Sequence, residues 1–514
     1  MSANFVSELL RRRVPQVVGV YLAAGWGLLE FTDWATGRFQ LSNGATDLVV
    51  GTWVLFLPVV AGAAWRLGQA DRRRRTPGRG MPAAAPAARP TEIVVLPFAN
   101  LSQNPEDEYL SDGICEEITN ELARMEGLQV VARTSAFAYK GKAMDVRAIG
   151  RELGAGAVLE GSVQRSGDRL RITTQLVEVS TGYHLWSERF DREMKDVFDI
   201  EDEISANVVQ ALRGILKDAE REALAKNPTE DVRAYEFYLR GRQFFRQSRR
   251  KSLHYARQMF EKAVEVDPGF ALAWTGIAES ICLTDMYYPS SGADLGRADE
   301  ASARALELDS DLAEAHGARG FALLQLKRVD EAEEEFKTAI ELDPNQFEAR
   351  YFYARACFSQ GRLEDAARLF QEAAAVREDY QAAFFAAQAL EALGRDDEAA
   401  DGYRQALMVA QKHMELNPDD PRAATMRAVS HCRSGDRAAG LRWAERALEI
   451  DPHDAGVRYN VACLYSLEEQ PDRAIECLEK AMDAGFGHRD WIEQDPDLDP
   501  LRELPRFQEL VARL

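Results

Sequence analysis

A short motif recurs along the second half of the chain and decides its fold. It reads "AVEVDPG" at residues 263–269, "AIELDPN" at 339–345 and "ALEIDPH" at 447–453, with weaker copies "ALELDSD" at 305–311 and "HMELNPDD" at 413–420. The step from Asp309 to Asp343 is 34 residues, and the step from Asn417 to Asp451 is again 34. A constant spacing indicates that one structural unit is repeated along the chain.

A 34-residue period is typical of the tetratricopeptide repeat, a pair of antiparallel helices. Small residues let the two helices approach closely, an aromatic ring fills the remaining gap, and a proline such as Pro344 stops the second helix. The positions that fit this pattern are Gly320, Ala332, Phe336, Ala339, Ala366, Phe370, Ala373, Ala256, Phe260, Ala263, Ala474, Leu478 and Ala481. We predict about seven repeats over residues 230–488, beginning near 237, 271, 313, 347, 380, 421 and 455.

Two repeats depart from the pattern, with extra residues around 286–296 and 408–416. Insertions of this kind fall in turns or lengthen one helix, so they bend an array without interrupting it. The last stretch, 489–514, is predicted to be a capping segment, because a terminal repeat needs a cover for its apolar face.

Charge is distributed unevenly. The net charge is −21, but the first 90 residues carry 11 arginines, no lysine and five acidic residues, a net +6 that leaves −27 for the remainder. Such an acidic body argues against nucleic-acid binding and is most simply a solubility feature. The six cysteines show no CxxC spacing, which predicts a reducing compartment with neither a disulfide framework nor a zinc site.

Two apolar runs near the N-terminus predict a transmembrane hairpin within residues 1–75, with helices at about 14–33 and 47–66. Each run approaches the ~20 residues that cross a bilayer. The alternatives are a secretory signal for the first run and a buried soluble helix for the second, although no A-x-A cleavage site follows the first.

Arginines at 11–13 and 72–75 flank this predicted hairpin, and only Arg38 lies between its runs. The positive-inside rule therefore predicts a multi-pass protein of the bacterial inner membrane, bound through residues 14–66, with its folded parts in the cytoplasm. The arginine run at 72–75 is interpreted as a topology anchor that also touches anionic lipid, rather than as a nucleic-acid site. Residues 76–91, rich in Pro and Ala, are predicted to be a linker.

Between residues 92 and 217 the pattern changes to strands alternating with helices. We expect strands at 92–98 and 128–132, helices around 114–125 and 146–153, a hairpin over 157–179 that turns at 166–168, and a strand near 183–190. A long helix follows, with Ile200, Ile204, Val208, Leu212 and Ile215 on one face.

This order resembles the TolB-like amino-terminal domain of bacterial membrane proteins, above all in residues 94–125, 154–192 and 196–213. The resemblance implies an α/β domain placed between a membrane segment and tetratricopeptide repeats. The resulting fold class is multidomain: a two-helix transmembrane hairpin, an α/β TolB-like domain and an all-α repeat solenoid. In relatives, an adenylate cyclase or winged-helix domain often precedes the membrane segment. Only 13 residues stand there in this sequence, so we expect any such output to be absent or to come from another polypeptide.

We find no motif that would carry chemistry. The "GAGA" at 154–157 is short of a nucleotide-binding GxGxxG and follows a helix, and the acidic clusters lack the ligand spacing of a calcium loop. No GxSxG, HExxH, P-loop or kinase motif occurs. We therefore predict a protein that is not an enzyme and has no catalytic residue, cofactor, metal or small-molecule substrate.

The predicted site is the inner groove formed by the first helices of successive repeats, where positions 2, 5, 9 and 12 of each unit face a partner. The residues expected to bind a protein partner there are Tyr351, Arg355, Phe321, Glu348, Tyr459 and Asn460. The leading function is a membrane-anchored scaffold for protein–protein interaction. The alternatives are a regulatory subunit for a separately encoded adenylate cyclase or transcription factor, an envelope-facing assembly factor, and a cyclase.

Overall fold

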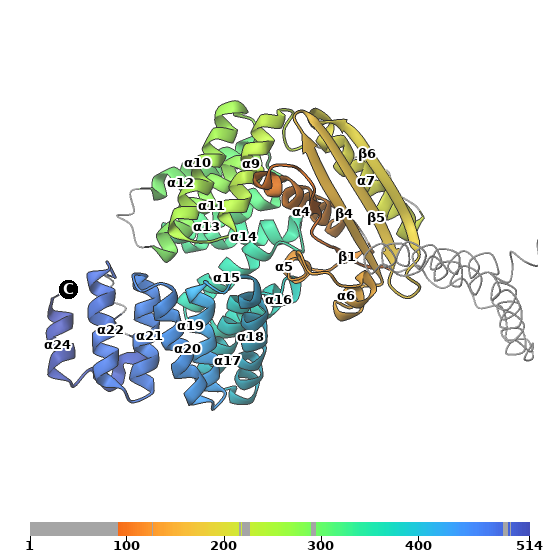
Figure 1. Ribbon diagram of the computed structural model, residues 1–514. Coiled ribbons are helices and arrows are strands. Elements are labelled where there is room, and N and C mark those ends of the chain that lie inside the picture. The colour runs from red at the N-terminus through yellow and green to blue at the C-terminus, as the bar shows by residue number, and fades with distance from the viewer. Residues whose placement is uncertain are drawn as a thin grey trace, which may run out of the picture. The chain divides into compact units, whose positions relative to one another are not determined.

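The computed structural model describes residues 91–513 except 126, 215–216, 218–226, 289–293, 487–491 and 494. All of them belong to one compact unit that extends from Arg89 to Leu514. It is a mostly helical solenoid with a small sheet at its N-terminal end (Figure 1).

The sheet has six strands in the order β3-β1-β4-β5-β6, with the short β2 beside β4. Strands β1, β3 and β4 are parallel, whereas β4, β5 and β6 form an antiparallel meander. Their bounds are β1 Glu92–Val95, β2 Ala99–Asn100, β3 Gln129–Val130, β4 Ala157–Ser166, β5 Arg169–Glu178 and β6 His184–Glu193. The predicted strands and the hairpin turn at 166–168 are confirmed at these positions.

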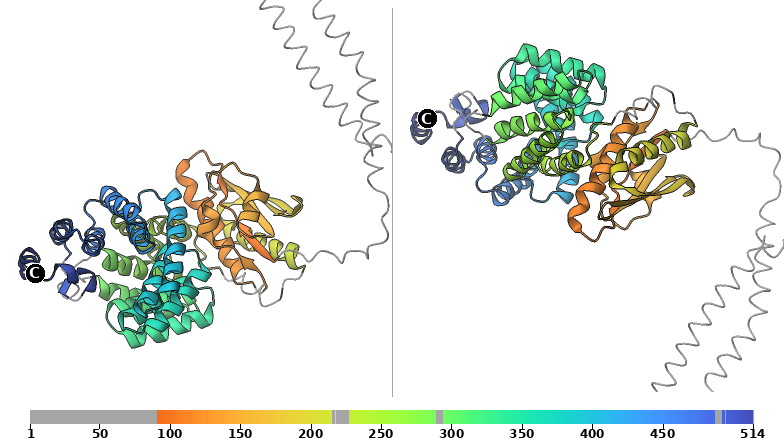
Figure 2. Two further views of the ribbon diagram at one scale, coloured as in Figure 1. Left: turned by 90° about the horizontal axis from the view of Figure 1, so that it is seen from below. Right: turned by 90° about the horizontal axis from the view of Figure 1, so that it is seen from above.

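Helices cover the sheet according to the alternation of its side chains. Ile93 and Val95 of β1 face a core shared with α4 (Glu108–Ala123) and α7 (Val197–Arg213), whereas Val94 faces a second core with Ile149 of α6 (Val146–Glu152). The short α5 (Arg133–Phe137) follows β3, and Figure 2 shows α4 between the sheet and the repeats.

The repeats form seven antiparallel helix pairs among the described residues. They are α9 (Val232–Phe245) with α10 (Arg250–Val266), α11 (Ala271–Tyr287) with α12 (Leu295–Leu308), α13 (Ala313–Gln325) with α14 (Val329–Leu342), α15 (Phe347–Ser359) with α16 (Leu363–Val376), α17 (Tyr380–Ala392) with α18 (Asp396–Leu416), α19 (Pro421–Arg433) with α20 (Arg437–Ile450), and α21 (Ala455–Leu467) with α22 (Pro471–Asp483). Six of the seven predicted repeat starts coincide with the first residue of a helix. The first pair begins at Val232, five residues before the expected position.

The predicted packing of each pair is confirmed. Ala332, Phe336 and Ala339 are completely buried, and a Cβ atom added to Gly320 would lie 2.6 Å from the Phe336 ring. After the last pair, η3 (Pro496–Leu501) and α24 (Pro505–Ala512) bury Leu498, Leu501, Phe507 and Leu510 in the core of the final repeats. The predicted domain boundaries stay predictions.

The predicted fold class is wrong in its first part. No helix in the described ranges is long and apolar enough to cross a membrane. The predicted hairpin helices, about 14–33 and 47–66, lie outside the described residues. The fold class is corrected to a mostly helical repeat solenoid with a small sheet region. The predicted location as a multi-pass inner-membrane protein is corrected on the same finding.

The sheet region and the first repeat share a continuous core. Helix α4 crosses α9 so closely that a Cβ atom on Gly113 would lie 2.7 Å from Leu239. Beside this crossing, the Tyr235 hydroxyl donates to both carboxylate oxygens of Glu201, at 3.0 and 3.1 Å. Glu201 is 3% exposed. Burial, with the nearby carboxylates of Glu121 and Glu117, raises the pKa of Glu201 well above its usual range.

The Gly320 contact predicts how one substitution affects stability. Gly320→Val should destabilise the chain by about 1–3 kcal/mol, because its side chain would overlap the Phe336 ring. Gly317→Ala on the same helix is the matched control, since its Cβ would have no neighbour closer than 3.7 Å. The control should be neutral or stabilising by up to about 1 kcal/mol. Urea denaturation followed by circular dichroism measures both, and equal midpoints for the two variants would contradict the packing argument.

Glu201 predicts a dependence of stability on pH. The unfolded chain ionises this carboxyl near a pKa of about 4.3, whereas the fold keeps it neutral to a higher pH. The contribution of Glu201 to the free energy of unfolding is therefore fully present below the pKa of the unfolded state and is lost as pH rises toward the pKa of the folded state.

Glu201→Gln keeps an acceptor for Tyr235 and removes this ionisation. We expect the variant to melt at a higher temperature than the wild type at pH 8 and at a similar temperature at pH 4.5. Glu203→Gln, on the same helix with a side chain 39% exposed, is the control and should follow the wild-type profile. A parallel pH profile for the wild type and Glu201→Gln would refute this prediction.

Candidate functional site: the inner groove of the repeats

The first half of the inner groove contains helices of the chain's own sheet region. Arg124, just after α4, forms an ion pair with Glu314 of α13 at 2.7 Å. Asn345, before α15, donates to the Ala123 carbonyl at 3.3 Å. Ser135 of α5 donates to Glu378, before α17, at 2.6 Å. These contacts join the sheet region to the third repeat and to the turns before the fourth and fifth repeats, so that part of the groove is already covered.

A cluster of buried charges holds α4 in this position. Glu116 of α4 lies between Arg242 at 3.2 Å, Arg133 at 3.6 Å and Arg246, with which it is also paired. Arg242 reaches Glu279 of α11 at 3.7 Å. Glu279 therefore faces the groove, but its carboxylate is paired with Arg242 of the chain itself.

The second half of the groove encloses a cavity of about 990 Å³. Its walls come mainly from the first helices of successive repeats, α15, α17, α19 and α21, and it is closed at one side by the end of α11. On α17 the lining residues include Gln381, Phe384, Phe385 and Gln388, and on α19 they include Arg422, Thr425, Met426 and Val429. Both sets follow the i, i+3, i+4, i+7 spacing of one helix face.

The array closes on itself at one end of this cavity. Arg422 lies over the Tyr287 ring at 4.1 Å and donates to the Ser248 carbonyl, 174 residues away in sequence. The Tyr288 hydroxyl donates to the same carbonyl at 3.1 Å, and Arg249 forms an ion pair with Asp419. The beginning of the array thus touches its sixth repeat.

A network of polar groups connects this closure to the floor of the cavity. The hydroxyls of Tyr287 and Tyr351 both donate to Gln381 Oε1, at 3.0 and 3.2 Å. Arg355 donates to the Tyr351 hydroxyl at 3.3 Å and lies 5.1 Å from the Phe385 ring centroid. In the described part of the chain, no carboxylate lies within 4.0 Å of the guanidinium of Arg355 or Arg422.

The opposite end of the cavity is acidic. Tyr459 of α21 donates to Asp495 at 2.5 Å, and the Cys463 thiol donates to the same carboxylate at 3.6 Å. Asp497 follows in η3, and burial, with the neighbouring Asp495, raises the pKa of Asp497.

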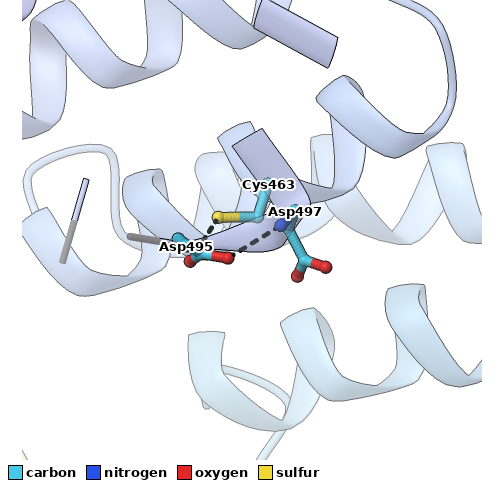
Figure 3. Close-up of side chains that lie close together, drawn as sticks. All are labelled: Cys463, Asp495 and Asp497. Carbon is cyan, nitrogen blue, oxygen red and sulfur yellow. Dashed lines mark hydrogen bonds between the residues drawn. The ribbon is translucent and has the colours of Figure 1, made fainter. Parts of the chain in front are cut away.

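Cys463, Asp495 and Asp497 are close enough together to be considered as metal ligands, with candidate atoms within 4.8 Å of one another. Figure 3 shows Asp495 in contact with both neighbours. Its Oδ1 accepts the Asp497 backbone N–H at 2.9 Å and caps η3, while its Oδ2 accepts from Tyr459 and Cys463. Both oxygens are engaged in fixing the turn, so we assign this cluster a structural role.

The structure brings three of the six predicted site residues into this cavity: Arg355, Tyr459 and Asn460. Tyr351 is 4% exposed and orients Arg355. Phe321 is buried and stacks on Phe352 at 3.7 Å, and Glu348 is paired with Arg377 at 2.8 Å. A direct role for any of the six in binding stays a prediction.

The residues missed by the sequence analysis are Arg422, Gln381 and Tyr287. The positional rule could have found the first two, because Gln381 and Arg422 occupy position 2 of the repeats that start at 380 and 421. The positional rule could not have found Tyr287. This residue lies in the cavity because the beginning of the array contacts the sixth repeat.

Comparison with known families identifies tetratricopeptide repeats at residues 293–347, 323–383, 354–413 and 455–484. The chain therefore contains such repeats, a fold that supports protein–protein interaction. A curated relative named putative adenylate cyclase 3, from Rhizobium meliloti, is 40% identical over 273 residues. That match covers 52% of this chain and 46% of the relative, so the chain spans about half the length of the curated relative it matches.

Solved structures similar to this chain include the YrrB protein, described as a TPR protein with an unusual peptide-binding site. It is 24% identical, with 38% of this chain and 92% of that chain covered and a TM-score of 0.25. The Cut9–Hcn1 hetero-tetramer is 15% identical, with 62% and 63% covered and a TM-score of 0.41. A tetratricopeptide repeat protein from Parabacteroides merdae is 15% identical, with 55% and 100% covered and a TM-score of 0.34.

Proposed function

We propose that the chain is a non-enzymatic scaffold that binds an extended segment of a protein partner in the second half of its inner groove. The observation that carries the proposal is the cavity of about 990 Å³ lined by four successive repeats. A cavity built from several stacked helices suits an extended peptide, because each helix contacts a different residue of the ligand.

The chemistry of the cavity supports the same proposal. Phe384, Phe385, Met426 and Val429 provide an apolar floor, and Arg355 and Asn460 provide polar groups at its sides. Aromatic and arginine side chains in a desolvated pocket are those that most often dominate the affinity of an interface. The covered first half of the groove leaves this second half as the proposed binding surface.

The sheet region has a separate part in the proposal. The resemblance of residues 92–217 to the TolB-like domain suggests a module that positions the repeats, and the contacts of Glu116 and Ser135 with the repeats support this role. On this view the sheet region serves to hold the first half of the array in one conformation.

We expect the full-length chain to select peptides from a display library of random ten-residue sequences. Phe385→Ala should lower the affinity for the selected peptides by at least tenfold in calorimetric titration, because the ring forms part of the cavity floor. Met408→Ala is the matched control, since Met408 is 68% exposed on the second helix of the same repeat and does not line the cavity. Equal affinity of both variants for every selected peptide would place binding elsewhere and overturn the proposal.

The relative named putative adenylate cyclase favours a second candidate, a regulatory role toward a separately encoded nucleotide cyclase. Under this candidate the purified chain changes the rate at which a partner cyclase converts ATP to cyclic AMP and forms none by itself. Cyclic AMP production by the purified chain alone would contradict the non-enzymatic proposal. An unchanged cyclase rate at saturating chain would remove the regulatory candidate.

A further inference from the structure

We infer that the segment bound in the groove carries an acidic residue at one end and a basic residue at the other. This inference rests on the proposed function and specifies the chemistry of its partner. It follows from the opposite charges at the two ends of the cavity.

The first end presents Arg355 and Arg422, and the carboxylates of Asp420 and Asp454 lie near Arg422 beyond ion-pair distance. Neither Arg355 nor Arg422 has a carboxylate within 4.0 Å in the described ranges. Nη1 of Arg422 is buried and donates to no described acceptor. Asp454 also lines the cavity, but its Oδ1 caps α21 by accepting the Val457 N–H at 2.9 Å. A ligand carboxylate would pair with Arg355, because guanidinium groups bind carboxylates through several parallel hydrogen bonds.

The second end presents acids in excess over bases. Glu391 is paired with Arg433 at 3.4 Å, and Glu468 is paired with Arg437 at 2.6 Å. Asp495 and Asp497 have no basic partner within 4.0 Å among the described residues. A lysine or arginine of the ligand would therefore meet an uncompensated negative field.

The two ends of the cavity correspond to the two ends of the first helices. Arg422 lies in the first turn of α19, whereas Glu391 and Arg433 lie in the last turns of α17 and α19. The apolar floor between the ends suits large apolar side chains in the middle of the segment.

The combination of charges also excludes uniformly charged partners. A polyanion such as nucleic acid would meet Asp495 and Asp497, and a polybasic segment would meet Arg355 and Arg422. Only a segment with both charges satisfies the two ends together.

The test uses five fluorescent ten-residue peptides that share a central Leu-Phe pair and differ only in the charge of their end residues. Two are bipolar with opposite orders, one is acidic at both ends, one is basic at both ends and one is uncharged. We expect one bipolar peptide to bind the full-length chain about tenfold more tightly than the other four, by fluorescence anisotropy. The ratio of its affinity to the affinities of the other four should fall at high salt, because salt screens the contacts between charged groups.

Two charge reversals test the ends independently. Arg355→Glu should reduce the preference for the bipolar peptide over the doubly basic peptide, and Asp497→Lys should reduce its preference over the doubly acidic peptide. Arg368→Glu is the matched control, since Arg368 lies on α16 outside the cavity and pairs with Asp365 and Glu372. It should leave the preferences among the five peptides unchanged.

The outcomes separate this inference from the function on which it rests. Equal binding of all five peptides to the wild type, or preferences unchanged by both reversals, would overturn the charge inference and leave the peptide-binding groove standing. No binding by any of the five, together with no peptide from the display selection, would overturn the groove as a binding site.

Discussion

The close approach of paired helices is the constraint on which the rest of the structure depends. Phe336 fits between α13 and α14 because Gly320 presents no side chain to it, and Ala332 and Ala339 keep the helices near enough to exclude water. The contact holds the two helices of one pair together, and the stacking of successive pairs produces the curvature of the solenoid. The groove, its cavity and its closure all follow from the curvature.

A curved array without the sheet region would have a long open groove. In this chain the sheet region covers the first half of that groove. Arg124, just after α4, and Ser135 of α5 engage the carboxylates of Glu314 and Glu378 in the repeats. Burying the charged cluster around Glu116 costs free energy. Removing its arginines would leave the Glu116 carboxylate buried without a partner, so the contact depends on these arginines. The sheet region is therefore part of the scaffold, and the repeats from α15 onward provide the remaining surface.

The local elements could be predicted from the sequence because their signals are local. The 34-residue spacing places six repeat starts at the observed helix starts, and the alternation of Leu170, Ile172 and Leu176 predicts the hairpin strand that the structure contains. The long-range contacts could not be predicted in this way. Arg124 follows α4 and Ser135 lies within the short α5, and nothing in the sequence near them indicates acids 190 and 243 residues further on. The predicted transmembrane hairpin rested on the length of two apolar runs and on the arginines that flank them, and its residues lie outside the described ranges.

The contact between Arg422 and Ser248 gives the solenoid a mechanical property that a linear array lacks. An array whose repeats touch only their neighbours behaves as a spring, because small rotations at each junction add up and let its pitch vary. Here a hydrogen bond joins the first repeat to the sixth, so the repeats between them cannot move apart along the array by thermal motion. A groove of constant width loses little conformational entropy when it is filled, and it also accommodates only ligands of matching thickness.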